Sequence, residues 1–503
     1  MSAVDTREAP RVGRDIAITT ATQVTVAVGG LLLYRLLALE KGAEGVASYA
    51  LVKQISIFAW PVVMVGLQTG IPRYVALGRS RPGGAEATLV AALLVTTTTM
   101  LAVSALALVS PGTTASVVFG DSGRTHLVMP LVLTLVATVV LEVVYGYFRG
   151  QADFVVGNAV RVVGVATLPV VLLLVAADRS IGTLIALMAA GLLAGSALAV
   201  ALPLARALRA TSAAEVRAAG RELLDYGHRR VVGEVAAVVL FTIPPILAAH
   251  YAPLDEVAWL ATGLYVIAVL SIAFQPVGVV FLPLLSRLVE SDFEAARRYT
   301  GHLAAAGLHI AVFVTPQLLL FADDAVRAWL GSEFDGAGRV IRIVVLSAGV
   351  YVITIVVRSA LDAAAVTAYN ARNNMISLAV AAVAAVVSLG ADLGDPLECI
   401  AWSFTLGVAC MGVLTLVVVV RVFDLPRSSL ALRAALALGG LAAAAAVGAD
   451  LAVIGDGASA ADLAVIAALE CLLAAGFVAG LVRAGAQWPR VLWARRPGRG
   501  AAG

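Results

Sequence analysis

The sequence predicts an all-α, polytopic integral membrane protein with about fourteen transmembrane helices. Of its 503 residues 61% are hydrophobic and 13% are charged, and the mean hydropathy of +0.97 is too high for a soluble globular protein. Many apolar runs reach the roughly 20 residues that a spanning helix needs. These runs are continuous and rich in Ala, Leu and Val, so they lack the alternation of β-barrel strands.

Fourteen windows of spanning length follow one another along the chain. They cover residues 16–38, 49–71, 86–109, 126–148, 155–177, 181–203, 231–250, 259–282, 302–321, 340–361, 373–391, 398–420, 430–449 and 462–482. The first window is too long for the apolar region of a signal peptide, and no convincing cleavage site follows it. We therefore expect an uncleaved first helix.

Charged residues between the windows support this count, because short cytoplasmic loops retain arginine and lysine. Every even-numbered connection is basic and every odd-numbered one is acidic. The basic connections include those with Arg73, Arg149, Arg217, Arg287, Arg372 and Arg421. The acidic connections include those with Glu40, Asp121, Asp178, Asp255, Glu333, Asp392 and Asp450. The alternation predicts a multi-pass protein of the cell membrane with both termini in the cytoplasm.

The small net charge of +3 is the sum of basic connections on one side of the membrane and acidic connections on the other. Its basic segments indicate contact with anionic membrane lipids, and none is interleaved with the stacking aromatics of a nucleic-acid-binding surface. The three cysteines have neither disulfide-framework nor metal-ligand spacing, and we interpret them as packing residues. We expect no metal, no cofactor and no nucleic-acid partner.

The two halves of the chain align with each other at an offset of 211 residues. Features that coincide at this offset are Val46-Ala47 with Val257-Ala258, Ala50 with Ala261, Pro72 with Pro283, Ser80 with Ser291 and Arg161 with Arg372. Together they align helices 1 to 6 with helices 7 to 12. Because six is an even number, both copies have the same orientation in the membrane, as in parallel repeats.

The repeat predicts the domain organisation. We expect an N-terminal lobe at 1–203, a cytoplasmic connection at 204–230, a C-terminal lobe at 231–420, and an accessory helix pair with a basic tail at 421–503. Such a duplication is typical of secondary transporters, although duplicated bundles can also be channels or scaffolds. We expect a monomer.

The sequence carries no sign of an enzyme or of a nucleotide-driven pump. Lys41 and Lys53 are its only lysines, and no GxxxxGK[ST] phosphate loop is present. Its polar connections are too short for a nucleotide-binding or catalytic domain. Energy for transport would have to come from a gradient, a partner or the substrate.

Charged residues inside the predicted helices are candidates for the transport site, since a charge at a helix centre costs roughly 2.5 to 3.5 kcal/mol. Arg35 and Lys53 each lie about one turn from the outer end of a helix in the first hairpin. Both could snorkel to the interface. Alternatively, both face a cavity and attract an anion such as a phosphate. Arg161 and Arg358, near the inner ends of helices 5 and 10, could extend this cationic lining or snorkel in turn.

Glu142 in helix 4 is the candidate for a proton- or cation-coupling carboxylate, and a salt bridge with Arg161 is an equally good interpretation.

Prolines and glycines inside spans mark places where helices bend. Pro61 and Gly66 interrupt helix 2, and Pro276 and Gly278 interrupt helix 8 at comparable positions of the second repeat. They suit paired gating hinges or static kinks.

Several motifs resemble those of the polysaccharide flippases, which belong to the multidrug, oligosaccharidyl-lipid and polysaccharide exporter superfamily. The first hairpin carries the main ones: Arg35, Glu44-Gly45, Tyr49-Ala50, Gly66-Leu67, Gly70-Ile71 and Arg73-Tyr74. Three later segments also match: Tyr147-Phe148-Arg149-Gly150-Gln151, Phe281-Leu282-Pro283 with Ser286-Arg287, and Ala328-Trp329-Leu330-Gly331 before Phe334.

This resemblance implies two six-helix lobes in a V that work by alternating access. It further implies a cargo of glycan on a polyprenyl diphosphate, with Arg35 and Lys53 as diphosphate contacts and Arg161 and Arg358 as secondary ones. Glycosyltransferases or a polymerase of the same pathway would be partners. Many such flippases have twelve spans; the fourteen predicted here resemble the related lipid II flippases.

Two other interpretations remain open. One is a cation-coupled small-molecule exporter of the multidrug branch, which would use Glu142 but gives no reason for Arg35 and Lys53. The other is a non-transporting scaffold or an enzyme of envelope synthesis. At the offset of 211 residues Arg35 falls on Ile246 and Lys53 on Leu264. Both cations therefore belong to one lobe, which suggests an asymmetric cavity.

Overall fold

A computed structural model describes the chain except for residues 1–8, 80–83, 229–230, 365–368, 427–439 and 441–503. All elements of the described residues are helical, so the predicted all-α class is confirmed. The predicted accessory pair at 430–449 and 462–482 lies outside the described residues.

The helices follow the predicted order. Their bounds are α1 (Ala9–Met64), α2 (Leu67–Gly78), α3 (Gly84–Val109), α4 (Pro111–Phe119), α5 (Val128–Gly150), α6 (Phe154–Arg161), α7 (Leu168–Val175), α8 (Ile181–Ala210), α9 (Ala213–His228), α10 (Val231–Ala248), α11 (Leu254–Ser291), α12 (Phe293–Leu320), α13 (Ala322–Leu330), α14 (Gly338–Val345), α15 (Ala348–Ala364), α16 (Tyr369–Gly390) and α17 (Pro396–Val422). Short helical turns η1 (Ser122–Leu127), η2 (Val162–Thr167) and η3 (Ser332–Phe334) join some of them.

Ten helical stretches in the described residues are long and apolar enough to cross a membrane. The first of them, Ala17–Met64, folds back at Gly42 and so contains two predicted spans, and the shorter apolar helix Val235–Ala248 corresponds to the seventh. The described part of the chain thus contains helices for the first twelve predicted spans. The chain is a multi-pass membrane protein.

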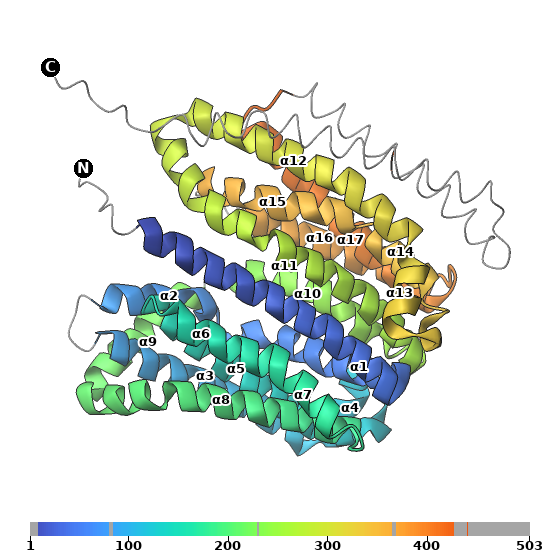
Figure 1. Cartoon of the computed structure of the whole chain (residues 1–503), viewed down its shortest axis with the longest axis horizontal. Helices are drawn as coiled ribbons and strands as arrows, with labels where there is room; N and C mark the ends of the chain where they lie inside the picture. The colour runs from blue at the N-terminus through green and yellow to red at the C-terminus, as the bar shows by residue number, and fades with distance from the viewer. Residues whose placement is uncertain (1–8, 80–83, 229–230, 365–368, 427–439, 441–503) are drawn as a thin grey trace. The chain divides into compact units, whose positions relative to one another are not determined.

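The first hairpin is a single helical element interrupted at Gly42, where φ is +66°. The left-handed backbone there favours glycine, and it reverses the chain without a loop (Figure 1). The helix stays regular across residues 43–48, where the sequence predicted a connection. Lys53 consequently lies about three turns beyond the reversal, not one.

The second limb of the hairpin is interrupted again at Val65 and Gly66, whose φ angles are +49° and +73°. α1 ends before this pair and α2 begins after it, so the predicted second span is a broken helix. The interruption lies one turn after Pro61, whose ring removes a backbone hydrogen bond.

The described residues form two compact units. Unit 1 comprises Met1–Pro276, Ala325–Val344 and Asn374–Gly407, and unit 2 comprises Val277–Asp324, Val345–Asn373 and Val408–Gly503. The lobe boundaries expected from the repeat remain a prediction.

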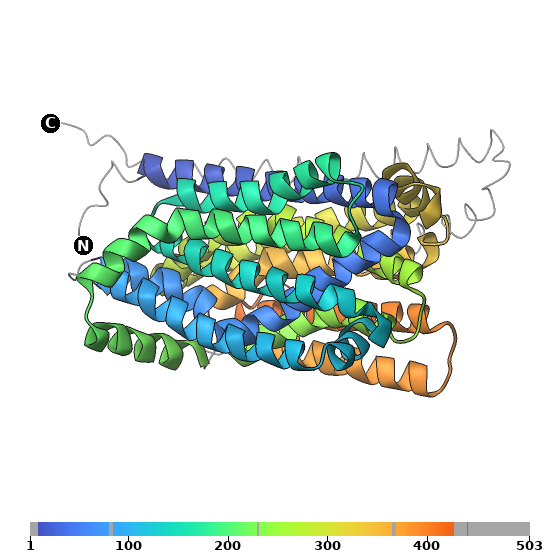
Figure 2. The same cartoon turned by 90° about the horizontal axis from the view of Figure 1, so that it is seen from below.

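The core of unit 1 is built around α5, which packs along α8 and against α1, α2 and α3 (Figures 1 and 2). Its helix buries one side chain after another, including Leu135, Val139, Val143 and Tyr147. Such a continuous apolar surface is the pattern of a central helix surrounded by others.

In unit 2, α12 packs along α15. Gly307 and Gly349 allow close approach there: a Cβ on Gly307 would lie 3.5 Å from Val356, and one on Gly349 would lie 3.0 Å from Cβ of Ala311. Small residues at helix contacts are typical of membrane bundles.

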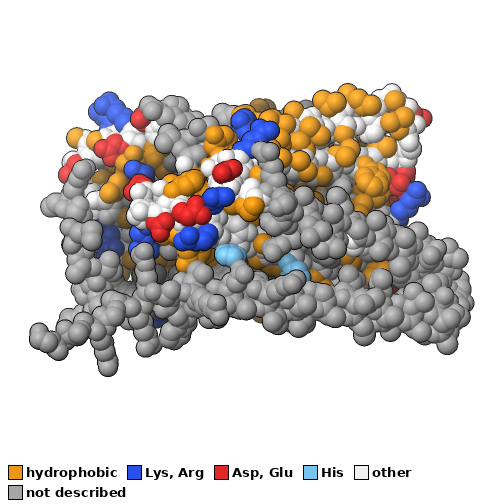
Figure 3. Space-filling view, turned by 90° about the horizontal axis from the view of Figure 1, so that it is seen from above, with side chains coloured by type: hydrophobic (Ala, Val, Ile, Leu, Met, Phe, Trp, Pro, Cys, Tyr) orange, Lys and Arg blue, Asp and Glu red, His pale blue; other side chains and the backbone are white. Residues whose placement is uncertain are grey.

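Figure 3 shows hydrophobic side chains over the right-hand part of the described surface in that view and charged side chains mainly in its left-hand part.

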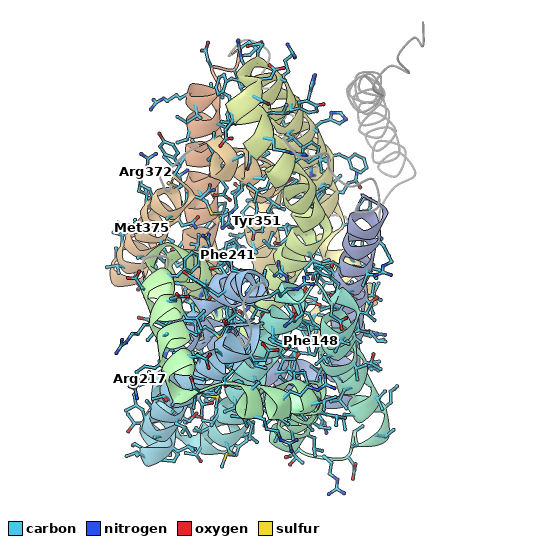
Figure 4. All side chains as sticks on the ribbon, turned by 90° about the vertical axis from the view of Figure 1, so that its left-hand side faces the viewer. Phe148, Arg217, Phe241, Tyr351, Arg372 and Met375 are labelled. Atoms are coloured by element: carbon cyan, nitrogen blue, oxygen red, sulfur yellow. The ribbon has the colours of Figure 1, made fainter. Side chains whose placement is uncertain are left out.

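The connection between the predicted lobes contains a helix, α9, that packs against α2 and α3. It begins with a capping box: the Glu215 backbone N–H donates to Ser212 Oγ at 3.3 Å, and the Ser212 N–H donates to Glu215 Oε2 at 2.7 Å. Leu223 is fully buried on the inner side of α9, whereas Arg217 points away from the helices. Figure 4 shows Arg217 outside and Phe148 among the helices.

Candidate functional site

Four aromatic rings meet beside the first hairpin, and we call Tyr34, Tyr49, Tyr265 and Trp329 the aromatic cluster. Tyr34 stacks on Tyr265 with ring centroids 4.4 Å apart and on Trp329 at 6.1 Å, and it meets Tyr49 edge-on at 6.0 Å. Tyr34 and Tyr265 are 2% and 9% exposed. The cluster brings α1 together with α11 and α13, more than 200 residues later in the chain, and all four residues belong to unit 1.

The ammonium group of Lys53 lies on this cluster. Its Nζ is 5.3 Å from the ring centroid of Tyr265 and 5.8 Å from that of Tyr49. Both distances are within the range of cation–π attraction. No carboxylate of the described residues forms an ion pair with Lys53.

Arg35, which follows Tyr34 in the sequence, is the second cation of this region. Its Nη1 is buried and has no hydrogen-bond acceptor among the described residues. This atom lies beside Gly331, two residues after Trp329, since a Cβ on Gly331 would be 3.9 Å from it. A buried guanidinium nitrogen without an acceptor is costly, so this place is suited to an anion.

Two hydrogen bonds join the aromatic cluster to the backbone of α1, and a third lies at the reversal of the hairpin. The indole N–H of Trp329 donates to the carbonyl oxygen of Leu31 at 2.9 Å, and the Tyr265 hydroxyl donates to that of Ala27 at 3.4 Å. At the reversal, the Ala43 N–H donates to Glu333 Oε2 at 2.9 Å. Glu333 thus binds the backbone next to Gly42, where a Cβ would approach the same oxygen to 2.8 Å.

The predicted coupling residue, Glu142, lies in a second polar group within unit 1. Its Oε1 is 3.8 Å from Nη2 of Arg161, and both side chains are largely buried, at 19% and 27% exposure. The guanidinium groups of Arg161 and Arg149 lie 5.0 and 5.5 Å from the ring of Tyr145. A π-helical turn, η2, starts directly after Arg161; such turns are frequent at functional sites.

Arg358, the fourth predicted diphosphate contact, lies in unit 2. Its Nε is 3.8 Å from Asp362 Oδ2 one helical turn later, and both side chains are about half exposed. Of the four predicted contacts, therefore, only Arg35 and Lys53 border the aromatic cluster. Arg161 is engaged by a carboxylate elsewhere in unit 1.

The hinge candidates fall in different places. Gly66 is part of the interruption between α1 and α2, where its Cα faces the end of α9: a Cβ on Gly66 would lie 2.5 Å from the carbonyl oxygen of Gly227. Pro61 lies inside α1. Pro276 and Gly278 belong to α11, and their side-chain surroundings lie outside the described residues.

A metal centre is absent from the described residues, in which no three His, Cys, Asp or Glu side chains come together.

Several solved structures with a similar fold are titled as transporters. A structure titled "Lipid II flippase MurJ, inward closed conformation" matches with a TM-score of 0.62 and 10% identity, over 95% of this chain and 99% of the other. An inward-facing multidrug resistance MATE family transporter of the MOP superfamily matches with a TM-score of 0.60 and 12% identity, over 82% and 98%. A MATE structure in complex with MaD3S gives 0.54 and 13%, over 82% and 96%.

The chain has the fold of the MOP superfamily. The MOP fold was expected from the resemblance of the first hairpin and three later motifs, and the structural comparison confirms it. No model of a known protein family and no curated protein sequence matches the chain. The comparison therefore establishes the fold and not the cargo.

Sequence reasoning missed most of the aromatic cluster as part of the site. Tyr49 and Trp329 belong to motifs of the sequence, whereas Tyr34 and Tyr265 carry no signal in it. Nothing in the local pattern of Tyr265 distinguishes it from a packing residue, because its role depends on contacts with Tyr34 and Lys53.

Proposed function

We propose that this protein is a transporter that moves a polyprenyl-diphosphate-linked oligosaccharide from the inner to the outer leaflet by alternating access. One observation carries this proposal: Arg35 and Lys53 border the same aromatic cluster, and neither has a carboxylate partner among the described residues. Two unpaired cations within apolar helices favour an anionic cargo. A diphosphate provides several oxygens for the guanidinium fork and the ammonium.

The lipid-linked part of the cargo is supported by the MOP fold. The compared structure with a TM-score of 0.62 is titled as a lipid II flippase. A polyprenyl chain would stay in the bilayer, and the diphosphate would need cationic compensation inside the protein. Enzymes that build or polymerise the same glycan are the proposed partners.

Substitution of the two cations tests this function. Arg35→Ala and Lys53→Ala should each abolish surface glycan in cells while the protein remains in the membrane at the normal amount. Arg217→Ala is the matched control, because this arginine is exposed on α9 and should be replaceable. Full glycan export by the Arg35→Ala, Lys53→Ala double variant would refute the anionic site.

The second candidate function is a cation-coupled small-molecule exporter, since MATE transporters share the MOP fold and Glu142 is a largely buried carboxylate. On our proposal Glu142 is engaged by Arg161, so Glu142→Gln should retain export of glycan. If Glu142→Gln stops transport while both cations can be replaced, the exporter is the better assignment.

A further inference from the structure

The ring of Tyr265 lies over the ammonium group of Lys53. Its ring centroid is 5.3 Å from Nζ of Lys53, nearer than that of Tyr49, and the ring is 9% exposed because Tyr34 stacks on it. A phosphate oxygen would have to come within about 3 Å of the ammonium nitrogen to accept a charge-assisted hydrogen bond. The ring and a phosphate group cannot both occupy this space.

The hydroxyl of Tyr265 lies against the backbone of α1. Gly30 faces Oη of Tyr265 so closely that a methyl group at this position would collide with it. The hydroxyl also donates to the carbonyl oxygen of Ala27, one turn earlier, at 3.4 Å. Because its ring stacks on Tyr34 and its hydroxyl is held against the backbone of α1, Tyr265 has one defined position over Lys53.

The two partners come from different repeats of the sequence. Lys53 belongs to the first hairpin, and Tyr265 belongs to α11, where the offset of 211 residues places it opposite Gln54. The second copy has Leu264 at the position of Lys53. Movement of α11 away from the hairpin would therefore remove Tyr265 from the cation without requiring any rearrangement of α1, and Tyr49 would remain beside it.

We infer that Tyr265 is a displacing residue: its ring competes with the diphosphate of the cargo for the ammonium of Lys53. The anion is released when the ring returns to its position over the ammonium. This inference rests on the proposed function for the identity of the anion. Tyr265 acts through Lys53 and is a positioning residue. It would promote release, so its removal should strengthen binding of the anion and slow turnover.

The test uses the full chain in lipid nanodiscs, titrated calorimetrically with farnesyl diphosphate and with inorganic pyrophosphate. Tyr265→Ala should bind both about tenfold more tightly than the unchanged protein, because the cation–π competitor is gone. Transport by Tyr265→Ala in vesicles should be slower at saturating cargo. Tyr265→Phe, which keeps the ring over the ammonium, should bind within about twofold of the unchanged protein.

Gly30→Ala provides an independent variant, because its methyl group displaces the hydroxyl without removing the ring. It should also bind more tightly. Tyr251→Ala, at an exposed tyrosine before α11, is the control and should change neither binding nor turnover. In a Lys53→Ala background, Tyr265→Ala should give no gain.

The outcomes distinguish the displacing role of Tyr265 from the proposed function. If diphosphate binding depends on Lys53 but is unchanged or weaker in both Tyr265→Ala and Gly30→Ala, the displacing role is wrong and the proposed function stands. A gain that persists without Lys53 also overturns it. If no variant binds a diphosphate in a manner that depends on Arg35 or Lys53, the proposed function itself fails.

Discussion

Trp329 contacts two other rings of the aromatic cluster and also the backbone of α1. Its ring stacks on Tyr34 and Tyr265 with centroid distances of 6.1 and 6.2 Å, and its indole N–H donates to Leu31 at 2.9 Å. Aromatic packing and a buried hydrogen bond are thus combined in one side chain. Only one of them depends on the indole nitrogen, so the two can be separated by substitution.

We predict that Trp329→Phe lowers the free energy of unfolding by about 1 kcal/mol, the usual net contribution of one hydrogen bond. The phenyl ring retains stacking, and the N–H is lost. Thermal or denaturant unfolding in detergent measures the change. Trp402→Phe is the control, because Trp402 is 44% exposed and should have almost no effect. Equal effects of the two substitutions would contradict a specific role for the indole nitrogen.

At the scale of the elements, α9 closes over the interruption between α1 and α2. The carbonyl oxygens of Val65 and Gly227 each approach the glycine of the opposite segment, so two backbones are in direct contact. Tyr226 adds an edge-on contact with Tyr74 at 5.7 Å and lies 5.2 Å from the guanidinium of Arg73. The helix that connects the predicted lobes is therefore anchored on the break in the second span.

Gly66→Ala should destabilise this anchor by about 1 to 3 kcal/mol, since alanine is strained at positive φ. The new Cβ would also lie 2.5 Å from the carbonyl oxygen of Gly227. Unfolding in detergent and proteolysis within α9 report the loss. Gly195→Ala in α8 is the control: nothing lies within 4 Å of its Cβ position, and alanine favours a helix. If Gly66→Ala is no worse than this control, the anchor contributes nothing.

The capping box of α9 predicts a dependence of its local stability on pH. The backbone and hydroxyl hydrogen bonds from Ser212 lower the pKa of Glu215 below its ordinary value of 4.5. A lowered pKa stabilises the fold above the unfolded value, and this contribution disappears as the pH falls through the folded value.

Hydrogen exchange of the first turn of α9 should accordingly increase as the pH is lowered below the ordinary glutamate value, after correction for the intrinsic exchange rate. In Glu215→Gln this acid-induced increase should be absent. An identical pH profile for both proteins would show that the carboxylate does not stabilise the helix start.

At the scale of the whole molecule, the distribution of charge predicts the orientation in the membrane. Arginines concentrate in the even-numbered connections and acidic residues in the odd-numbered ones, and the positive-inside rule then predicts that both termini are in the cytoplasm. Under this orientation the Gly42 reversal, Glu333 and the aromatic cluster lie toward the outer side. The hydrogen bond between Glu333 and Ala43 would then lie at the outer end of the first hairpin.

Reporter fusions test this orientation in a bacterial host. Alkaline phosphatase, which is active only outside the cytoplasm, should be active when fused after Asp178 and inactive when fused after Arg217. The opposite pattern would invert the predicted direction of transport. Active fusions at both positions would contradict the number of helices between them.

The order and helical nature of the first twelve spans could be predicted from the sequence, because the length of an apolar run is a local property that the bilayer requires. The MOP fold could also be anticipated from motifs of the first hairpin. The reversal at Gly42 could not, since the polar residues 40–44 have the composition of a loop and yet continue the helix. Nor did the connecting segment predict that α9 would pack on the interruption.

The sequence by itself identified Arg35 and Lys53 as charges that need an explanation, because a charge inside a long apolar run is visible in the sequence and is costly in lipid. Tertiary structure alone decided what surrounds them. Tyr265 and Trp329 are more than 200 residues away in the chain, and contacts over such separations depend on how the helices pack rather than on any local pattern. Packing likewise separated Arg161, which pairs with Glu142, from the two cations at the aromatic cluster.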